Sequence, residues 1–481
     1  MKAADVVIVG AGIAGMVTAV SSAQAGARTV LIEKRATFTA HGAYNGAVNS
    51  RLQKALGIEI DKEELVAQLI RWAGAKVDQR LVRLWADKSG EAMDWLLEMA
   101  EAGGQSDIKV DTDILSSKDE FYREYPTAHL FPGRQGGLMK MLQNNAKTCN
   151  VEMRYQTRAV RVIREANGRI TGVVVEIGTE KFGLFQAKRG VVLCTGGYSH
   201  DPEMVKEYCP WALGIDNWYT PPVDTGDGHK MGVWVGAAID AVPHGTMIHP
   251  GFNPAGFPLN VPVSLMAVPF LSVNVHGERY MNEDVPMPYL SNAQLVQPGS
   301  LYWQVWDAKW PEDASRMGRT LGRLREKPES AAQAIEKGVT LGAVITAPSI
   351  EQLAQKMEVP PAVFKATVKR YNQLAQIGKD LDFGKRPTRL STLEKSPFYA
   401  VKRQPQLLTT VSGLKINTGL QVLDKDWKII PGLYAAGNVS GGFFGDCYPF
   451  MAPGLSHGRA LTFGRLAGLN AAASKERRTT M

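Results

Sequence analysis

The N-terminal stretch has the most regular pattern of apolar and polar positions in the chain. Residues 6–9 are four consecutive β-branched residues and residues 29–32 form a second apolar run, so both are typical of buried strands. Between them, apolar residues at helical spacing predict a helix that begins near Met16 and ends at Gly26. A strand, a helix and a second strand in this order predict a βαβ unit with parallel strands.

A glycine-rich turn joins the first predicted strand to the helix. Gly10, Gly12 and Gly15 have the spacing G-x-G-x-x-G, and Glu33 follows the second strand. In such a turn the first glycine permits a tight bend, the second lets the backbone approach a diphosphate, and the third lets helix and strand pack closely. The helix N-terminus offers N–H groups to phosphates, and the acid accepts ribose hydroxyls. The pattern therefore predicts a dinucleotide site.

The same pattern of strand followed by glycine returns twice later in the chain. Residues 190–197 run from an apolar strand into a glycine pair, and residues 434–438 run from a strand into Gly437. Helical spacing is also present at residues 63–101, 136–145, 331–337, 363–377 and 456–473, and strand patterns at 151–155, 160–163 and 170–175. We therefore expect a dinucleotide-binding domain built from residues 1–245 and 405–481, interrupted by a capping domain of residues 246–404.

Composition places the chain among ordinary globular proteins. It has 481 residues, 44% of them hydrophobic and 21% charged, which is enough for two or three domains. The net charge of +8 favours anionic ligands weakly, but the basic residues are scattered, so no nucleic-acid partner is expected. No stretch reaches the ~18 apolar residues of a membrane helix, and no signal peptide opens the chain, which predicts a cytoplasmic protein.

The cysteines narrow the possible redox chemistry. Cys149, Cys194, Cys209 and Cys447 lie far apart and form no C-x-x-C pair. An iron–sulfur cluster, a zinc site or a disulfide framework is therefore not expected. If the protein moves electrons, it needs an organic cofactor.

Taken together, the motifs resemble the flavoproteins of the fumarate reductase, succinate dehydrogenase and 3-ketosteroid dehydrogenase group. The resemblance covers nearly the whole chain. It rests on the glycine fingerprint, the small-residue loop 37–49, and the motifs at residues 195–197, 225–228, 277–283 and 432–438. It implies an α/β fold in which a Rossmann-like FAD-binding domain carries an inserted α+β capping domain. It also implies FAD, with hydride transfer between flavin N5 and a carbon beside a carbonyl.

The resemblance further implies which residues contact FAD. They are Gly10, Gly12, Ala14, Gly15, Glu33, Lys34, Asn45, Gly46, Val160, Thr195, Gly196, Asp227, Gly437, Asn438, Leu455 and Ser456. His41 lies close to the position at which succinate dehydrogenases bind FAD covalently, but its distance to Asn49 is one residue shorter. We expect noncovalent binding, with a covalent bond to His41 as the alternative.

Three positions depart from the dicarboxylate-reducing members of this group. In those enzymes two arginines and a histidine hold the substrate carboxylates, and one arginine delivers the proton. This chain has Met287, Met451 and Thr409 at the corresponding positions. Without charge-assisted partners two carboxylates are not held, so fumarate and succinate are not the expected substrates.

The steroid-dehydrogenase branch resembles the chain more closely. Its members carry Tyr-Pro and then Pro-Gly before the last helix, as residues 448–454 do here with two additional residues. In those enzymes the tyrosine and the glycine N–H polarise a ketone as an oxyanion hole, which implies this role for Tyr448 and Gly454. Their base tyrosine corresponds to Met287, so we expect Tyr289, two residues later, or His249 to transfer the proton.

Aromatic and methionine side chains complete the predicted substrate pocket. They are Tyr219, Phe252, Phe257, Phe270, Tyr289, Phe443, Phe444, Tyr448, Phe450 and Met451. The sequence therefore predicts an FAD-dependent oxidoreductase acting on a C=C or CH–CH bond beside a carbonyl, in a bulky, weakly charged small molecule such as a steroid or an aromatic natural product. A single dinucleotide fingerprint predicts an external electron donor or acceptor. A 3-ketosteroid-type dehydrogenase and an electron-transfer flavoprotein remain alternatives.

Overall fold

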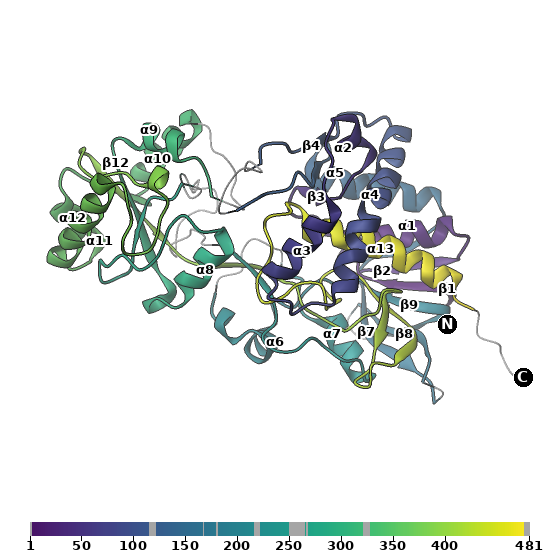
Figure 1. Ribbon diagram of the computed structural model, residues 1–481. Coiled ribbons are helices and arrows are strands. Elements are labelled where there is room, and N and C mark those ends of the chain that lie inside the picture. Colours follow the sequence, from purple (N-terminus) through teal and green to yellow (C-terminus); the bar gives the residue numbers. More distant parts are fainter. Residues whose placement is uncertain are drawn as a thin grey trace, which may run out of the picture.

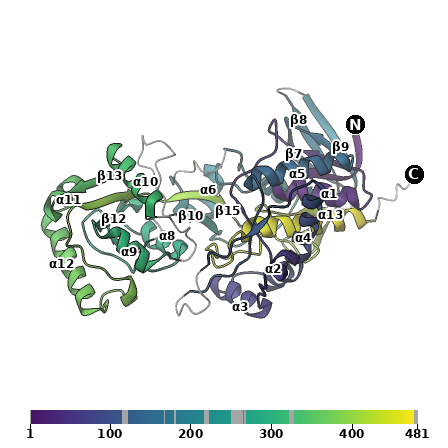
Figure 2. The same cartoon turned by 90° about the horizontal axis from the view of Figure 1, so that it is seen from above.

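A computed structural model describes residues 2–114, 122–166, 168–178, 181–215, 222–249, 265, 268–320 and 328–475 of the chain. Figure 1 shows two lobes, of which the larger contains both termini and the smaller contains the teal and green middle of the chain. Figure 2 shows the same division from above. The α/β fold expected from the sequence is confirmed.

The core of the larger lobe is an eight-stranded sheet. β1 (Lys2–Val9) lies in its middle, parallel to β2 (Thr29–Ile32) on one side and to β9 (Lys181–Leu193) on the other. β17 (Ile429–Ala435), from the end of the chain, adds in parallel beside β9. The remaining strands are β6 (Glu152–Arg154), β7 (Thr157–Arg164), β8 (Ile170–Ile177) and β16 (Gln421–Leu423). The central parallel segments, residues 6–9, 30–32, 191–193 and 433–435, are apolar and buried, as is typical of a sheet covered on both faces.

The first and last helices of the lobe pack closely against each other. α1 (Ile13–Gln24) and α13 (Leu455–Ala473) lie side by side in both views (Figures 1 and 2). A Cβ atom on Gly464 would lie 2.7 Å from the Ala14 carbonyl oxygen, so only glycine allows this approach. The other helices of the lobe are α2 (Arg51–Ala55), α3 (Lys62–Trp72), α4 (Gln79–Ala102), α5 (Arg134–Thr148), α6 (Pro202–Tyr208) and α7 (Asp227–Trp234).

The smaller lobe is built on a four-stranded antiparallel sheet. Its strands, in spatial order, are β11 (Leu271–Val273), β12 (Tyr302–Asp307), β14 (Phe398–Arg403) and β13 (Val344–Ala347). The helices of this part of the chain are α8 (Met287–Leu295), α9 (Trp310–Met317), α10 (Pro328–Thr340), α11 (Ile350–Met357) and α12 (Pro361–Ile377). β10 (Thr246–His249) and β15 (Gln406–Thr410) form an antiparallel pair between the lobes. We propose that the capping domain is residues 246–404, which begin with β10 and end just before β15.

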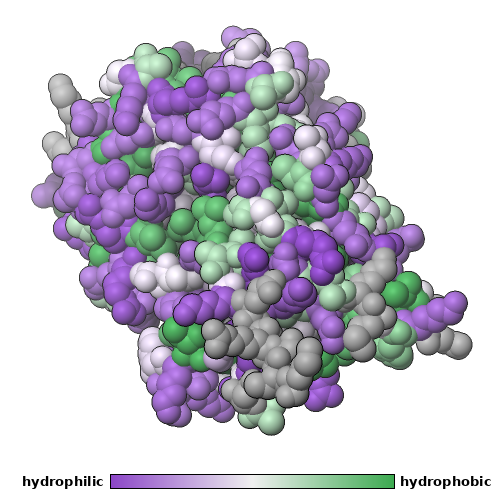
Figure 3. All heavy atoms as spheres, turned by 90° about the vertical axis from the view of Figure 1, so that its right-hand side faces the viewer, coloured by the Kyte–Doolittle hydropathy of each residue, from purple (hydrophilic) through white to green (hydrophobic). Residues whose placement is uncertain are grey.

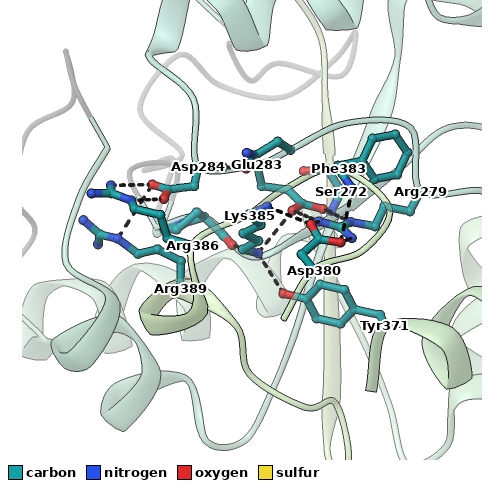
Figure 4. Close-up of polar contacts among 12 residues, drawn as sticks. Ser272, Arg279, Glu283, Asp284, Tyr371, Asp380, Phe383, Lys385, Arg386 and Arg389 are labelled. Carbon is teal, nitrogen blue, oxygen red and sulfur yellow. Dashed lines mark hydrogen bonds and ion pairs between the residues drawn. The ribbon is translucent and has the colours of Figure 1, made fainter. Parts of the chain in front are cut away.

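Buried ion pairs hold the inner part of the smaller lobe together (Figure 4). This lobe is called the capping lobe below. The Arg279 guanidinium donates to Glu283 at 2.9 Å and to Asp380 at 2.8 and 3.0 Å. Lys385 donates to the Tyr371 hydroxyl at 2.7 Å and lies 3.2 Å from Glu283. Buried charges are costly unless each is paired, and here each has an opposite partner. The 277–283 motif therefore stabilises the capping lobe.

Short strands and turns complete the fold. β3 (Tyr44–Gly46), β5 (Ala128–Leu130) and β4 (Lys109–Val110) form a small antiparallel sheet within stretches expected to be loops. The helical pattern at 63–101 belongs to two helices, α3 and α4, because the chain turns through left-handed Gly74 and Ala75 between them. Short 3₁₀ turns occur at Pro210–Ala212, Pro298–Ser300 and Pro387–Arg389.

The surface matches the scattered charges of the sequence. On the face shown in Figure 3, hydrophilic residues predominate and hydrophobic ones occur in small groups among them. In the part of the chain that the structure describes, no helix is both long and apolar enough to cross a bilayer.

Three buried histidines should make the fold sensitive to acid. Burial lowers the pKa of His129, His229 and His457 to about 4, from the ordinary 6.5. Between these values the unfolded chain binds protons that the folded chain does not. The free energy of unfolding should therefore be constant above about pH 6.5 and fall below it, by up to about 1.4 kcal/mol per pH unit for each histidine.

Urea unfolding at a series of pH values would measure this dependence. In His129→Gln the fall in the free energy of unfolding below about pH 6.5 should be shallower than in the wild type. An identical pH dependence in the variant and the wild type would contradict the assignment of this histidine.

Candidate active site

A cavity of about 860 Å³ lies at the carboxyl ends of the parallel strands. Val9 of β1 and Ile32 of β2 line it, together with Cys194 and Gly437, which follow β9 and β17. Ligands of open α/β sheets bind at this edge, where the strand order changes direction. The sheet topology therefore places a binding site where the sequence predicted one.

Glycine is required at the three fingerprint positions for different structural reasons. Gly10 has φ +104°, and a Cβ atom there would lie 2.4 Å from the Cys194 carbonyl oxygen. A Cβ atom on Gly15 would lie 1.8 Å from the Gly10 carbonyl oxygen. Gly12 has no protein atom within 4 Å of its Cβ position, and it lines the cavity. Gly10 and Gly15 are thus needed by the fold, whereas Gly12 leaves space for a ligand at the start of α1.

The acid after β2 is held in place by backbone groups. Glu33 accepts N–H groups from Ala11 at 2.7 Å and from Arg35 at 2.8 Å, and it lines the cavity while being 7% exposed. Lys34 donates to Asp227 at 3.0 Å, and both line the cavity. A carboxylate fixed in this way presents its remaining lone pairs to a ligand hydroxyl.

Most of the residues predicted to contact FAD line this cavity. They are Gly10, Gly12, Ala14, Glu33, Lys34, Thr195, Gly196, Asp227, Gly437, Asn438 and Ser456. The other five, Gly15, Asn45, Gly46, Val160 and Leu455, are not among the lining residues, although each is next to one along the chain or packs behind it. Asn45, for example, accepts a hydrogen bond from the cavity residue Gln135 at 2.8 Å.

Three polar atoms at the cavity fit a missing polar ligand. Thr195 Oγ1, His41 Nδ1 and Gln135 Oε1 are buried and have no hydrogen-bond partner in the described part of the chain. Buried polar atoms are normally paired, so their presence here indicates a ligand that supplies the partners. The lining residues run from Glu33, after β2, to the start of α13 and include the polar groups that a dinucleotide needs.

Tyr448 lies at the start of the last helix. Its hydroxyl oxygen accepts the Ser456 N–H at 2.8 Å, and its ring packs against Phe450 at 4.9 Å between centroids. No described residue accepts the Tyr448 hydroxyl hydrogen, so it can be donated into the cavity, which Tyr448 lines together with Gly454. Burial raises the pKa of Tyr448, so the phenol stays protonated at neutral pH.

Of the two residues predicted to transfer the proton, only His249 reaches the cavity. It ends β10, lines the cavity, and packs its ring 5.7 Å from Phe450. Tyr289 stacks on Trp72 at 4.8 Å instead and is not a lining residue. Its place in the first turn of α8 directs the side chain toward α3, so the prediction for Tyr289 is not supported by its position.

Several side chains of the predicted substrate pocket lie elsewhere. Phe270 stacks on Trp306 in the core of the capping lobe, and Phe443 and Phe444 pack behind the cavity wall. Met287 and Met451 are 1% and 6% exposed and do not line the cavity. Tyr219, Phe252 and Phe257 lie outside the described residues.

His41 lines the cavity in the loop expected to lie against the flavin. Its ring centroid is 5.9 Å from that of His457, at the start of α13. Burial lowers the pKa of His41, although the nearby Asp224 acts in the opposite direction. The ring is neutral and its Nδ1 has no partner among the described residues. A covalent bond from His41 to FAD therefore stays the alternative to noncovalent binding.

The structure also adds residues that the sequence did not point to. Arg319, from the capping lobe, lines the cavity and donates to Glu124 of the larger lobe at 2.6 Å. His457 and Gln135 line it from α13 and α5, and they lie within 2.8 Å of each other. None of these residues belongs to a motif, so only the folded chain shows that they meet.

The comparison with known protein families agrees with this site. Residues 5–454 match the family described as FAD binding domain. The chain belongs to this family. FAD is therefore its cofactor, and the protein is an FAD-dependent oxidoreductase, as the sequence predicted.

Relatives of this family member cover almost its full length. It is 31% identical to the vinyl phenol reductase of Lactiplantibacillus plantarum, over 97% of this chain and 96% of that one. It is 29% identical to a fumarate reductase (cytochrome) of Shewanella frigidimarina, over 97% of this chain and 77% of that one. The 3-ketosteroid-Δ4-(5α)-dehydrogenase of Rhodococcus jostii RHA1 has the same fold, with a TM-score of 0.76, 23% identity, and coverage of 98% and 97%.

The space beside Gly12 gives a test of the FAD site. Gly12→Ala should fold normally, because its Cβ atom meets no protein atom, but it should weaken FAD binding about tenfold or more by filling space that the cofactor needs. Titration of the apoprotein with FAD, followed by flavin fluorescence, would measure the change. Gly136→Ala is the matched control, since its Cβ also meets nothing and Gly136 does not line the cavity. Equal FAD affinity in both variants would contradict the assignment.

Proposed function

We propose that this protein reduces a C=C bond conjugated to an oxygen-bearing group in a bulky, weakly charged aromatic or steroid-like substrate. The observation that carries the proposal is the composition of the cavity wall at the start of α13. There a neutral phenol, Tyr448, and the apolar side chains of Met247, Leu408 and Phe450 lie beside His249. Apolar walls with a few directed polar groups suit such substrates.

The cations around the cavity do not provide a clamp for carboxylates. Lys34, Arg134, Arg158 and Arg319 are the cationic side chains among the described lining residues, histidines aside. Asp227 pairs with Lys34 at 3.0 Å and lies 3.4 Å from Arg158, and Glu124 pairs with Arg319. Arg134 is exposed. Because most of these charges are already neutralised, a dicarboxylate gains little from them, which favours weakly charged substrates.

Each proposed role follows from a side chain's position. FAD, when bound, exchanges a hydride with a carbon of the substrate. The Tyr448 hydroxyl donates a hydrogen bond to the substrate oxygen and so stabilises the negative charge that develops there. The N–H group of Gly454, the residue before α13, supports the same charge. His249 supplies the proton for the other carbon, because it is the proton-transfer candidate that lines the cavity.

The relatives favour an aromatic alkene as the first substrate to test. The relative that spans nearly the same length is named for vinyl phenol. A vinyl phenol becomes enone-like when a proton adds to its terminal carbon and the phenolic proton leaves. The resulting quinone methide has a carbonyl conjugated to the carbon that accepts the hydride, so negative charge develops on the same oxygen. The same contact to Tyr448 can therefore hold either kind of oxygen, and the electrons come from an external donor.

Removing the Tyr448 hydroxyl should separate its proposed role from packing. Tyr448→Phe keeps the ring that packs on Phe450 but loses the donor, so turnover should fall by about 10² to 10³ while FAD stays bound. Tyr289→Phe is the control, because Tyr289 stacks on Trp72 outside the cavity, and its turnover should stay within about twofold of the wild type. Equal turnover in the two variants would remove Tyr448 from the reaction. Steady-state kinetics and the flavin absorbance of the purified variants provide both readouts.

Anaerobic reoxidation would test the substrate class directly. The flavin is reduced with dithionite, and its absorbance is followed after addition of a vinyl phenol, a bulky enone or fumarate. Fast reoxidation by the vinyl phenol or the enone, with none by fumarate, is expected. Reoxidation by fumarate would contradict the proposal. If no acceptor reacts and a saturated ketosteroid instead reduces the oxidised flavin, the enzyme is a dehydrogenase.

A further inference from the structure

A buried cation lies directly behind the wall of the cavity. Arg459, in the second turn of α13, has a relative exposure of 0%. Its guanidinium donates to the Ser440 carbonyl oxygen and to Asn438 Oδ1, both at 3.1 Å, and its Nε has no partner among the described residues. In the part of the chain that the structure describes, no carboxylate lies within 4 Å of it, unlike the buried Arg279 of the capping lobe.

The aromatic surroundings of Arg459 keep water away from its charge. The guanidinium carbon lies 4.7 Å from the ring centroid of Phe444 and 5.6 Å from that of Phe443. The Phe444 ring in turn packs 5.3 Å from the Tyr448 ring. Burial lowers the pKa of Arg459 to about 10, so the group remains charged at neutral pH. A desolvated charge without a direct counter-ion costs free energy, so a negative charge elsewhere is expected to compensate it.

The charged and titratable groups near Arg459 do not neutralise it. Asp240 is the nearest acid in its electrostatic surroundings, but its oxygens accept the N–H groups of Gly413 and Gly442 and face Lys415 at 3.9 Å. Tyr448 is protonated because burial raises its pKa. On α13 itself, His457 is neutral at pH 7. These groups leave part of the Arg459 charge uncompensated, so an anion bound in the cavity can interact with it.

Two parts of FAD carry negative charge in such a cavity. The diphosphate has the start of α1 and the space at Gly12 available to it, and its charge is the same in the oxidised and reduced cofactor. The flavin ring gains negative charge only on reduction, when it takes up two electrons and one proton. Two residues connect Arg459 to the cavity near the start of α13. Asn438 lines the cavity and accepts a hydrogen bond from Arg459, and Tyr448 lines it with the Phe444 ring packed between its own ring and Arg459.

We propose that Arg459 is a positioning residue that acts through Asn438 and whose buried charge stabilises the negative charge of the two-electron-reduced flavin. The charge behind the wall thereby favours the reduced state of the cofactor and keeps the reduced ring deprotonated. The field of a desolvated charge is weakly screened, so it acts without direct contact.

The reduction potential of the holoenzyme tests this role. Xanthine and xanthine oxidase reduce the flavin slowly beside a reference dye, and both absorbances are read. Arg459→Met should shift the two-electron equilibrium toward the oxidised flavin at least about tenfold, which is about 30 mV more negative. Arg459→Lys keeps the charge and should restore most of the potential at neutral pH. An unchanged potential in Arg459→Met would overturn the proposal.

The pH dependence separates a charge effect from a packing effect. Uptake of one proton per two electrons gives a slope of about 30 mV per pH unit, and uptake of two gives about 60 mV. The wild type should follow the shallower slope, whereas Arg459→Met should turn to the steeper one toward lower pH, because its reduced ring is protonated more easily. If the variant only binds FAD more weakly and keeps both potential and slope, Arg459 compensates the diphosphate, and the proposal is wrong.

A second arginine on the same helix provides the matched control. Arg465 also lies over an aromatic ring, at 4.7 Å from Trp95, but it lines a separate cavity. Arg465→Gln should leave the potential and its slope unchanged.

If Arg459→Met does not retain FAD, the Arg459→Lys variant alone tests the proposal. A buried lysine loses its proton at lower pH than arginine, so its potential should match the wild type at low pH and fall below it as the pH rises. The same dependence of the potential on pH in Arg459→Lys and in the wild type would overturn the proposal.

Discussion

The close approach of backbone to backbone around β1 determines the rest of the structure. Gly15 lets α1 reach the turn at Gly10, and Gly464 lets α13 reach α1. No side chain larger than hydrogen fits at these contacts, so the two ends of the chain can meet only in this arrangement. The cavity lies beside this meeting point, at the carboxyl ends of the central strands. The binding site is thus a consequence of how the sheet and its helices pack.

Charge is distributed differently in the two lobes. In the capping lobe, Arg279 and Lys385 are buried beside Glu283 and Asp380, so the charges satisfy one another and stabilise that core. Around the cavity, Lys34, Arg158 and Arg319 likewise face acids. Arg459 differs because its direct partners are neutral oxygens and aromatic rings. A charge left uncompensated by the protein acts on whatever anion enters the cavity.

The sequence predicted local geometry well and side-chain direction less well. The unit from Gly10 to Glu33 was predictable because glycine spacing and strand patterns act over a few residues. Tyr289, Phe443 and Phe444 do not line the cavity, because nearness to a motif along the chain does not determine which way a side chain points from its helix or loop. Arg319 could not be predicted at all, since it reaches the cavity only when the capping lobe folds against the larger one.

The charge of a cavity wall determines how the cavity selects a substrate. A clamp of two guanidinium groups selects negatively charged substrates. A neutral ring system binds poorly there, because both cations would stay unpaired. A wall that presents a phenol hydroxyl among apolar groups selects shape and one hydrogen-bond acceptor. A buried donor left without its acceptor costs more than a lost methylene contact, so even one hydroxyl can discriminate strongly. In the proposed reaction the position of Tyr448 beside the start of α13 joins that selection to catalysis, because the oxygen that satisfies the donor is the one on which charge develops.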